Sequence, residues 1–301
     1  MIKINDIEIG FDKFPNGEIL VDTKVLNSVE NGCRIDFKWE NNEDILRLYF
    51  VLRHLIARTP SIGEKEIYIY YMPYSRMDRE QNGNCFTLRY ICDFLISDCM
   101  AFEDKVFVVE PHSDKTLDML DGSCRINVIT PLTQKICDIE DIDIICYPDK
   151  GAKKRFQDDF IDKPVIYCDK KRDFDTGKIQ GLELITDGWN DADLKDKNIL
   201  IVDDLCSRGG TFYYTAKKLQ EYGVNDIFLG VCHMEKTVID GNLLEEYKNF
   251  DDVEPSIIKH IYCFNTMLDE CLVEDITQKY KNITVYDIEK FLKEGKVVEC
   301  Q

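Results

Sequence analysis

The sequence predicts an α/β protein of two domains, each built on a mainly parallel β-sheet that is flanked by helices. Short apolar runs alternate with stretches whose apolar residues recur at helical spacing, which is the pattern of parallel sheets covered by helices. With 301 residues the chain is long enough for two domains, and its 44% hydrophobic content supplies the residues for two packed cores. In folds of this class, ligands bind at the carboxyl ends of the strands.

Short apolar runs with the composition of buried strands recur along the chain. Most are rich in Ile and Val and are followed by a polar turn, as expected where helices cover both faces of a parallel sheet. The predicted strands are 67–71, 106–109, 142–147, 165–168, 199–202 and 227–231.

Two stretches between these runs have the periodicity of helices packed on a sheet. The first carries apolar residues at i, i+3, i+4 and i+7 spacing. The second begins after Gly210 and is ended by Gly223, which we expect in the left-handed conformation. The expected inner faces are Leu88, Ile91, Cys92, Leu95, Ile96 and Cys99 in the first helix, and Phe212, Thr215, Ala216 and Leu219 in the second.

The boundary between the domains is expected near the middle of the chain, where Pro131 and the polar stretch 139–143 interrupt the pattern. The expected N-terminal domain covers residues 1–128, and the C-terminal domain covers residues 129–284. Residues 285–301 are expected to pack back on the N-terminal domain.

The chain is strongly acidic, with 38 Lys and Arg against 57 Asp and Glu and a formal net charge of -19. This charge repels nucleic acid and anionic membranes, so neither is expected as a partner, and an anionic ligand needs a local basic patch. The thirteen Cys residues are scattered without a CxxC pair, which suits buried thiols in a reducing compartment better than a disulfide framework. Because no export signal or membrane-spanning stretch is recognisable, we expect a cytoplasmic protein.

The stretch 198–212, NILIVDDLCSRGGTF, is the most informative part of the sequence. A buried strand delivers Asp203 and Asp204, whose carboxylates can accept hydrogen bonds from sugar hydroxyls. The following glycines let the backbone approach a ligand, and the amides at the start of a helix, with the Thr211 hydroxyl, can hold a phosphate. A bare pair of acids or of glycines is more often an ordinary turn, but their combination is far rarer.

This combination resembles the ribose-phosphate binding loop of the type I phosphoribosyltransferase superfamily. The resemblance implies that both domains are phosphoribosyltransferase-like. The superfamily contains transferases that consume phosphoribosyl pyrophosphate and synthetases that make it, and the loop does not separate the two. The residues that the resemblance assigns to ribose 5-phosphate are Asp203, Asp204, Ser207, Arg208, Gly209, Gly210 and Thr211.

Further motifs resemble the synthetase branch, the ribose-phosphate pyrophosphokinase family, in order and spacing over nearly the whole chain. The stretch 71–80, YMPYSRMDRE, resembles the family's Pro-Tyr-x-Arg-x-Asp-Arg motif, and 108–116, VVEPHSDKT, places a histidine after a buried strand as the family does. The segment 13–19, KFPNGEI, looks like the adenine-contacting segment, in which Phe14 would stack on the base. The ATP-binding residues implied by this resemblance are Phe14, Asn16, Glu18, Arg76, Asp78, Arg79 and His112.

Two stretches resemble the metal-binding and catalytic segments of the family. The stretch 147–156, YPDKGAKKRF, resembles Pro-Asp-x-Gly-x-x-x-Arg, in which Asp149, together with His112, would hold Mg²⁺. The stretch 169–178, DKKRDFDTGK, is polar and contains a glycine, and we interpret it as a mobile lid. The resemblance makes Lys170 and Arg172 its catalytic pair, although basic runs are usually solvated faces.

The resemblance implies transfer of pyrophosphate from Mg-ATP to the anomeric hydroxyl of ribose 5-phosphate, which gives phosphoribosyl pyrophosphate and AMP. It also implies a homo-oligomer, a dimer or a hexamer built of dimers, in which the Phe14 segment serves a neighbouring chain. The sequence departs from the family at Ser207 and Arg208, where the loop usually has Asp-Thr, and at Met77, where Gln is common. Two alternatives stay open: a phosphoribosyltransferase acting on a base, and a synthetase-like regulatory protein without catalysis.

Overall fold

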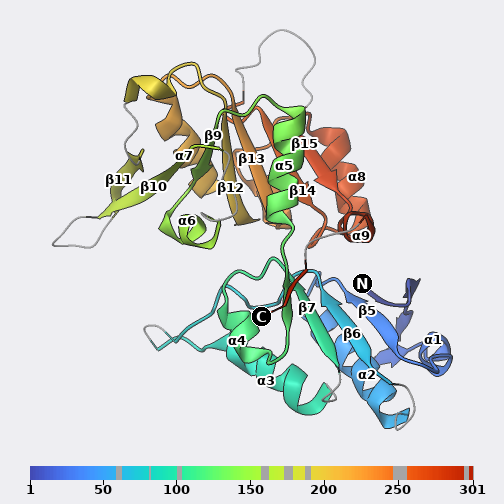
Figure 1. Cartoon of the computed structure of the whole chain (residues 1–301). Coiled ribbons are helices and arrows are strands. Elements are labelled where there is room, and N and C mark those ends of the chain that lie inside the picture. The colour runs from blue at the N-terminus through green and yellow to red at the C-terminus, as the bar shows by residue number, and fades with distance from the viewer. Residues whose placement is uncertain are drawn as a thin grey trace. The chain divides into compact units, whose positions relative to one another are not determined.

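The structure is a computed structural model, and it divides the chain into two compact units (Figure 1). Unit 1 consists of Met1–Asn127 with Gly295–Gln301, and unit 2 of Val128–Glu294. The residues that the structure describes are 1–58, 63–80, 83–99, 104–156, 163–172, 179–186, 191–246, 256–294 and 298–300.

Unit 1 contains a mixed sheet with a parallel centre, a separate two-stranded hairpin and four described helices. Its strands are β1 (Ile2–Ile4), β2 (Ile7–Glu8), β3 (Phe11–Lys13), β4 (Ile19–Val21), β5 (Cys33–Phe37), β6 (Lys65–Ile69), β7 (Lys105–Val109), β8 (Cys124–Ile126) and the C-terminal β16 (Val298–Cys300). Its helices are α1 (Lys24–Asn27), α2 (Glu43–Arg58), α3 (Thr87–Cys99) and α4 (Lys115–Met119).

The sheet of unit 1 has the order β16-β8-β7-β6-β5-β1-β2. The central strands β5 to β8 pair in parallel, whereas the pairs at both edges are antiparallel. The predicted strands 67–71 and 106–109 are confirmed as β6 and β7. The apolar pattern does not predict strand β5, because Arg34 and Asp36 interrupt its apolar run even though its other side chains are buried.

The core of unit 1 lies between one face of this sheet and the helices α2 and α3. Leu88, Cys92 and Leu95 of α3 are buried in it and Ile91 packs against it, which confirms the predicted inner face at these positions. The side chains of Ile96 and Cys99 lie outside the described residues. The longest described helix is α2, with 16 residues, and no described helix is long and apolar enough to cross a membrane.

Unit 2 is built on a second sheet with helices on both faces. Its strands are β9 (Ile144–Tyr147), β10 (Val165–Arg172), β11 (Ile179–Ile185), β12 (Ile199–Cys206), β13 (Ile227–Met234), β14 (His260–Phe264) and β15 (Ile283–Tyr286). Its helices are α5 (Ile129–Ile139), α6 (Lys150–Phe156), α7 (Gly210–Gln220), α8 (Glu270–Lys279) and α9 (Ile288–Lys293), with short 3-10 helices η1 (Asp191–Leu194) and η2 (Lys236–Asp240).

The strand order in unit 2 is β11-β10-β9-β12-β13-β14-β15, and every pair except β10 with β11 is parallel. From β9 the chain moves to β10 on one side and later returns to β12 on the other side. Strands β9 and β12 therefore flank the point where the strand order reverses. In open α/β sheets, this reversal opens a crevice at the carboxyl ends of the two strands.

Helices cover both faces of the sheet in unit 2. The predicted inner face of α7 is confirmed, because Phe212, Thr215, Ala216 and Leu219 are all buried. Gly223 has a φ of 73°, the left-handed conformation expected after this helix. On the opposite face, α5 packs so closely on β13 that a side chain at Gly230 would lie 2.9 Å from Ile136.

Most of the described cysteines carry free thiols. Cys92, Cys146, Cys168 and Cys263 are among these and are buried, as their apolar surroundings predict. Cys124 is the exception, because it is disulfide-bonded, and it lies opposite Cys300 in the register of β8 with β16.

A buried ion pair stabilises unit 1 at the start of β6. Lys65 Nζ lies 2.8 Å from Asp104 Oδ1, and their side chains are 2% and 0% exposed. Asp104 also accepts a hydrogen bond from the backbone N–H of Lys65. Lys105, on the adjacent strand β7, forms a solvent-exposed ion pair, in which its Nζ lies 2.5 Å from Glu64 Oε1.

We expect Lys65→Met to lower the free energy of unfolding of unit 1 by about 3 to 5 kcal/mol, because it removes the cation that lies 2.8 Å from the buried Asp104 carboxylate. The matched variant Lys105→Met should cost less than about 1 kcal/mol, because its ion pair is solvated. Urea unfolding can be followed by Trp39 fluorescence in a Trp189→Phe background, where only unit 1 retains a tryptophan. Equal decreases in the free energy of unfolding for the two variants would show that the contribution of the Lys65–Asp104 pair to stability does not depend on its burial.

Candidate active site

The carboxyl ends of β9 and β12 bring together two adjacent carboxylates and one arginine. Asp203 and Asp204 lie in the second half of β12, which runs past the predicted end at residue 202. Arg155 of α6, the helix that follows β9, donates one nitrogen to Asp203 Oδ1 at 2.8 Å and to Asp204 Oδ1 at 2.6 Å. The three side chains are 22%, 13% and 3% exposed for Arg155, Asp203 and Asp204. Arg155 follows strand β9, whereas the two acids lie on β12, so the three side chains meet because these two strands are neighbours.

This cluster holds more carboxyl groups than cations, and the imbalance shifts the pKa values of its members. Burial and the neighbouring charge of Asp204 raise the pKa of Asp203 well above its ordinary value, and Arg155 offsets only part of that rise. Burial lowers the pKa of Arg155, but the carboxylates of Asp204, Asp203 and Asp149 outweigh it, so the net shift is upward. The guanidinium therefore stays charged among three carboxylates, and the cluster has capacity for a further cation or for hydroxyl donors.

Asp149 lies at the start of α6. Its Oδ1 accepts hydrogen bonds from the backbone N–H groups of Gly151 and Ala152, at 2.8 and 3.0 Å. Within the described residues, no group of three or more His, Cys, Asp or Glu side chains is arranged to hold a metal ion by itself. A divalent cation at this carboxylate would therefore need further oxygen ligands from a bound phosphate or from water.

The loop from Ser207 to Thr211, which we call the phosphate loop, turns the chain from β12 into α7. Gly209 has a φ of 77°, and a side chain at this position would overlap Leu243, so only glycine fits without displacing its neighbour. Helix α7 begins at Gly210 and has 11 residues, so its first amides and its dipole favour an anion here. The Arg208 side chain is exposed and forms no ion pair with any described residue.

The interpretation of 169–178 as a loop is wrong for its first residues. Lys170 and Arg172 belong to β10, which runs antiparallel to β11 with Lys170 opposite Leu182 and Arg172 opposite Ile179. The backbone hydrogen bonds of this ladder extend the strand despite its polar composition. The side chains of both residues, and residues 173–178, lie outside the described residues.

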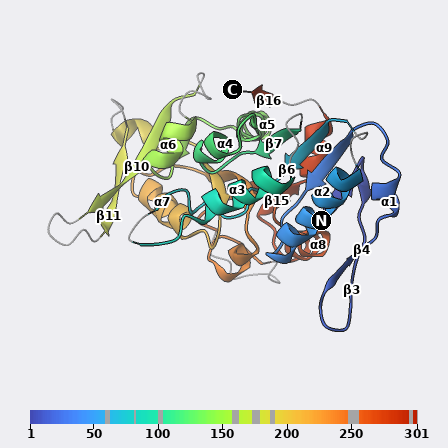
Figure 2. The same cartoon turned by 90° about the horizontal axis from the view of Figure 1, so that it is seen from below.

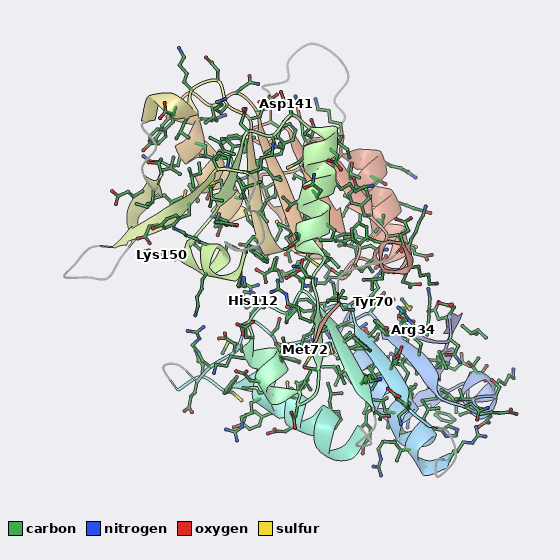
Figure 3. All side chains as sticks on the ribbon, viewed as in Figure 1. Arg34, Tyr70, Met72, His112, Asp141 and Lys150 are labelled. Atoms are coloured by element: carbon green, nitrogen blue, oxygen red, sulfur yellow. The ribbon has the colours of Figure 1, made fainter. Side chains whose placement is uncertain are left out.

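Two other basic residues of the 147–156 stretch connect α6 to β10. Lys150, labelled in Figure 3, forms an ion pair with Asp169 at 2.5 Å. Lys153 Nζ lies 4.0 Å from the centre of the Tyr167 ring. These contacts join the helix that carries Arg155 to the strand that carries Lys170.

Unit 1 brings two of its predicted motifs together at the adjacent ends of β6 and β7. The carboxylate of Asp78 accepts two hydrogen bonds from Arg79, at 2.8 and 3.1 Å. These bonds are the largest cause of a lowered pKa of Asp78, and the nearby Ser113 and His112 act in the same direction. Asp78 therefore lies beside the histidine of the second motif, which Figure 3 labels.

The backbone is strained at both strand ends in unit 1. Tyr74 and Glu110, which follow β6 and β7, have φ values of 63° and 40°. Glu110 is also buried and bonded to Arg125. Non-glycine residues in this region cost free energy and tend to occur at functional sites.

The residues of the 13–19 segment lie on the turn of the β3–β4 hairpin, which Figure 2 shows projecting from the main sheet of unit 1. Phe14 is 50% exposed. Asn16 Oδ1 accepts the backbone N–H of Glu18, and an ion pair between Lys13 and Glu43 of α2 ties the hairpin to the unit. Phe14, Asn16 and Glu18 are therefore presented together at an exposed tip.

Comparison with known proteins agrees with this architecture. No protein-family model matches the sequence. Ribose-phosphate pyrophosphokinase of Pyrococcus furiosus is 28% identical over 235 residues, which are 76% of this chain and 78% of that protein. The protein of the same name from Methanobrevibacter smithii is 25% identical over 249 residues, 78% of this chain and 80% of that protein. The crystal structure of phosphoribosylpyrophosphate synthetase from Mycobacterium smegmatis superposes with a TM-score of 0.73 at 20% identity, covering 96% of this chain and 90% of the other.

The fold is that of an α/β protein of two units, each built on a sheet flanked by helices, and it is shared with the phosphoribosylpyrophosphate synthetase of Mycobacterium smegmatis. Within that class, the chain is a relative of the ribose-phosphate pyrophosphokinases, and the resemblance that its motifs predict is confirmed.

We expect Arg155→Met to destabilise unit 2 by about 3 kcal/mol, because the substitution removes the cation that contacts both neighbouring carboxylates. Asp203→Asn should be neutral or stabilising at pH 7, since it removes one of two repelling charges and keeps a hydrogen-bond acceptor for Arg155. Hydrogen exchange of the amides in β12 and α7 measures both effects. The reverse order of stability would contradict the assigned roles.

The pH dependence gives an independent readout of the same variants. Because the pKa of Asp203 is raised on folding, its contribution to stability is complete below the unfolded value of about 4 and is lost as the pH rises through the folded value. Asp203→Asn should remove this loss and flatten the pH dependence above about pH 4.

Proposed function

We propose that this protein is a ribose-phosphate pyrophosphokinase, which transfers pyrophosphate from ATP to the anomeric hydroxyl of ribose 5-phosphate and releases AMP. The observation that carries the proposal is the acid pair and phosphate loop at the strand-order reversal of unit 2, in a chain whose relatives bear that name. The ATP-type motifs of unit 1 favour it over a base phosphoribosyltransferase.

In this proposal unit 2 binds ribose 5-phosphate. Asp203 and Asp204 accept hydrogen bonds from the ribose hydroxyls, and their fixed position on β12 orients the anomeric oxygen. The phosphate loop binds the 5-phosphate through the amides at the start of α7 and the Thr211 hydroxyl. The exposed guanidinium of Arg208 supplies a positive charge beside these amides, which an anionic substrate needs in a chain with a net charge of -19.

Unit 1 binds ATP in the same proposal. Arg76 and Arg79 contact its phosphates, His112 lies at the nucleotide, and Asp78 positions Arg79 through the two hydrogen bonds that join them. Tyr74 and Glu110 hold the strand ends in strained conformations that fix these side chains.

We propose Mg²⁺ as the metal, because the Asp149 carboxylate offers the hard oxygen ligand that this ion prefers, and a bound phosphate would supply further oxygens. Asp149 and His112 are its proposed protein ligands. The bound metal would neutralise charge on the phosphate oxygens. Lys170 and Arg172 would add positive charge where negative charge grows during the transfer, and the antiparallel pairing of β10 with β11 fixes their backbone.

We further propose that the protein acts as a homo-oligomer in the cytoplasm. An aromatic ring that is half exposed at the tip of a hairpin is suited to a site on another chain. In this arrangement Phe14 stacks on the adenine bound by a neighbouring subunit, with Asn16 and Glu18 beside it.

The first test of this function is a turnover assay. Protein mixed with Mg-ATP and ribose 5-phosphate, without any base, should form AMP and phosphoribosyl pyrophosphate in equal amounts, as measured by ³¹P NMR. EDTA should abolish turnover. Product formation only after addition of a base would favour the transferase, and nucleotide binding without any product would favour the regulatory protein.

Mixing two inactive variants tests the shared site. Phe14→Ala and Lys170→Ala should each lose about 10²- to 10³-fold in kcat, the typical cost of one preorganised contact. Co-assembled from denaturant, they should regain up to a quarter of the parent activity, roughly the fraction of sites with both intact residues in a random mixture. The double variant on one chain, mixed with itself, is the control. An active monomer in sedimentation experiments would contradict the shared site.

A further inference from the structure

The segment that follows β13 braces the phosphate loop. Ser207 Oγ lies 3.0 Å from Thr237 Oγ1, which in turn donates to Glu235 Oε2 at 3.1 Å. We call Glu235 and Thr237 the brace. Thr237 lies 30 residues from Ser207 in the sequence, so the sequence of the loop itself does not predict this contact.

The donor inventory fixes the direction of these hydrogen bonds. A carboxylate can only accept, so the single hydroxyl proton of Thr237 is used in its bond to Glu235. The Thr237 oxygen is then the acceptor for Ser207, whose own proton must point to Thr237. Ser207 therefore has no proton left for a phosphate oxygen, and an anion gains nothing from its lone pairs.

Backbone contacts hold the loop from the same side. The N–H of Glu235 donates to the carbonyl of Cys206 at 2.8 Å. A side chain at Gly241 would overlap the carbonyl oxygen of Arg208, and Leu243 fills the space beside Gly209. Residues 235–243 thus contact the chain at each position from Cys206 to Gly209, which restricts the conformation of the loop.

We propose that Thr237 and Glu235 are positioning residues for ribose 5-phosphate binding. They orient Ser207 away from the phosphate, so that the loop presents its backbone amides, Thr211 and Arg208 to the ligand. This inference rests on the proposed function, because it takes the 5-phosphate as the anion at the loop. It makes Ser207 part of the support of the loop and not a ligand of the phosphate.

The test is a double-mutant cycle of Thr237→Val and Ser207→Ala. Each single variant should weaken ribose 5-phosphate about tenfold in Kd by calorimetry and in KM by turnover, as expected when one hydrogen bond is lost from the support of a site. The double variant should be no weaker than either single variant, because both break the same connection. The KM for ATP should stay within about twofold of the parent value.

Two controls separate positioning from general destabilisation. Thr237→Ser keeps the hydroxyl and should stay within about twofold of the parent in Kd. Thr277→Val removes a hydroxyl that bonds only within the exposed face of α8, and should leave ribose 5-phosphate binding unchanged.

The outcomes that overturn the inference are distinct from failure of the function. If the losses in ribose 5-phosphate affinity of Ser207→Ala and Thr237→Val add up in the double variant, Ser207 contacts the phosphate directly. Weaker ribose 5-phosphate binding by Thr237→Ser, or unchanged binding by Thr237→Val, would show that the Thr237 hydroxyl does not position the loop. A parent that binds ribose 5-phosphate without making AMP would refute the proposed reaction alone, since the Kd cycle would still decide the brace; a parent that binds none would refute both.

Discussion

The contact of Arg155 with Asp203 and Asp204 is the interaction on which the candidate site depends. Two adjacent carboxylates at the end of a buried strand repel each other and lose hydration, so the fold needs a cation beside them. The cation comes from the helix after β9, which is possible only because β9 and β12 are neighbours at the reversal of strand order. The same contact fixes α6, and with it Asp149, relative to β12. Stability of the sheet and geometry of the site are therefore maintained by one group of charges.

Local positive charge in a strongly acidic chain is the second constraint. The net charge of -19 opposes the approach of any anion, so attraction of an anionic ligand has to come from fixed groups close to its site. The start of α7 and Arg208 provide it in unit 2, while Lys150 and Lys153 are engaged with Asp169 and Tyr167. Rigid support matters here, because dipoles that are already oriented lose little free energy when the ligand binds. The packing of Gly209 and Gly241 against their neighbours provides that rigidity.

In unit 1 the predicted motifs come together in a different way, at the ends of two adjacent parallel strands. Its sheet has no reversal of order between β6 and β7, and the two motifs meet because adjacent parallel strands end at the same edge. Asp78 lies beside His112 for this reason, although they are far apart in sequence. The left-handed backbone of Tyr74 and Glu110 shows that these turns are held against their local preference by the surrounding contacts.

The sequence by itself determined the local elements and the residue types at the strand ends. The inner face of α7, the left-handed Gly223 and the acids of β12 follow from periodicity and from the short-range chemistry of turns, which are encoded within a few residues. Only the tertiary structure decided which strands are neighbours. It paired Arg155 with acids 48 and 49 positions away, extended β10 through Lys170 by pairing it with β11, and placed Thr237 against Ser207. These contacts depend on topology and on hydrogen bonds between distant segments, and a one-dimensional pattern of apolar and polar residues carries no record of them.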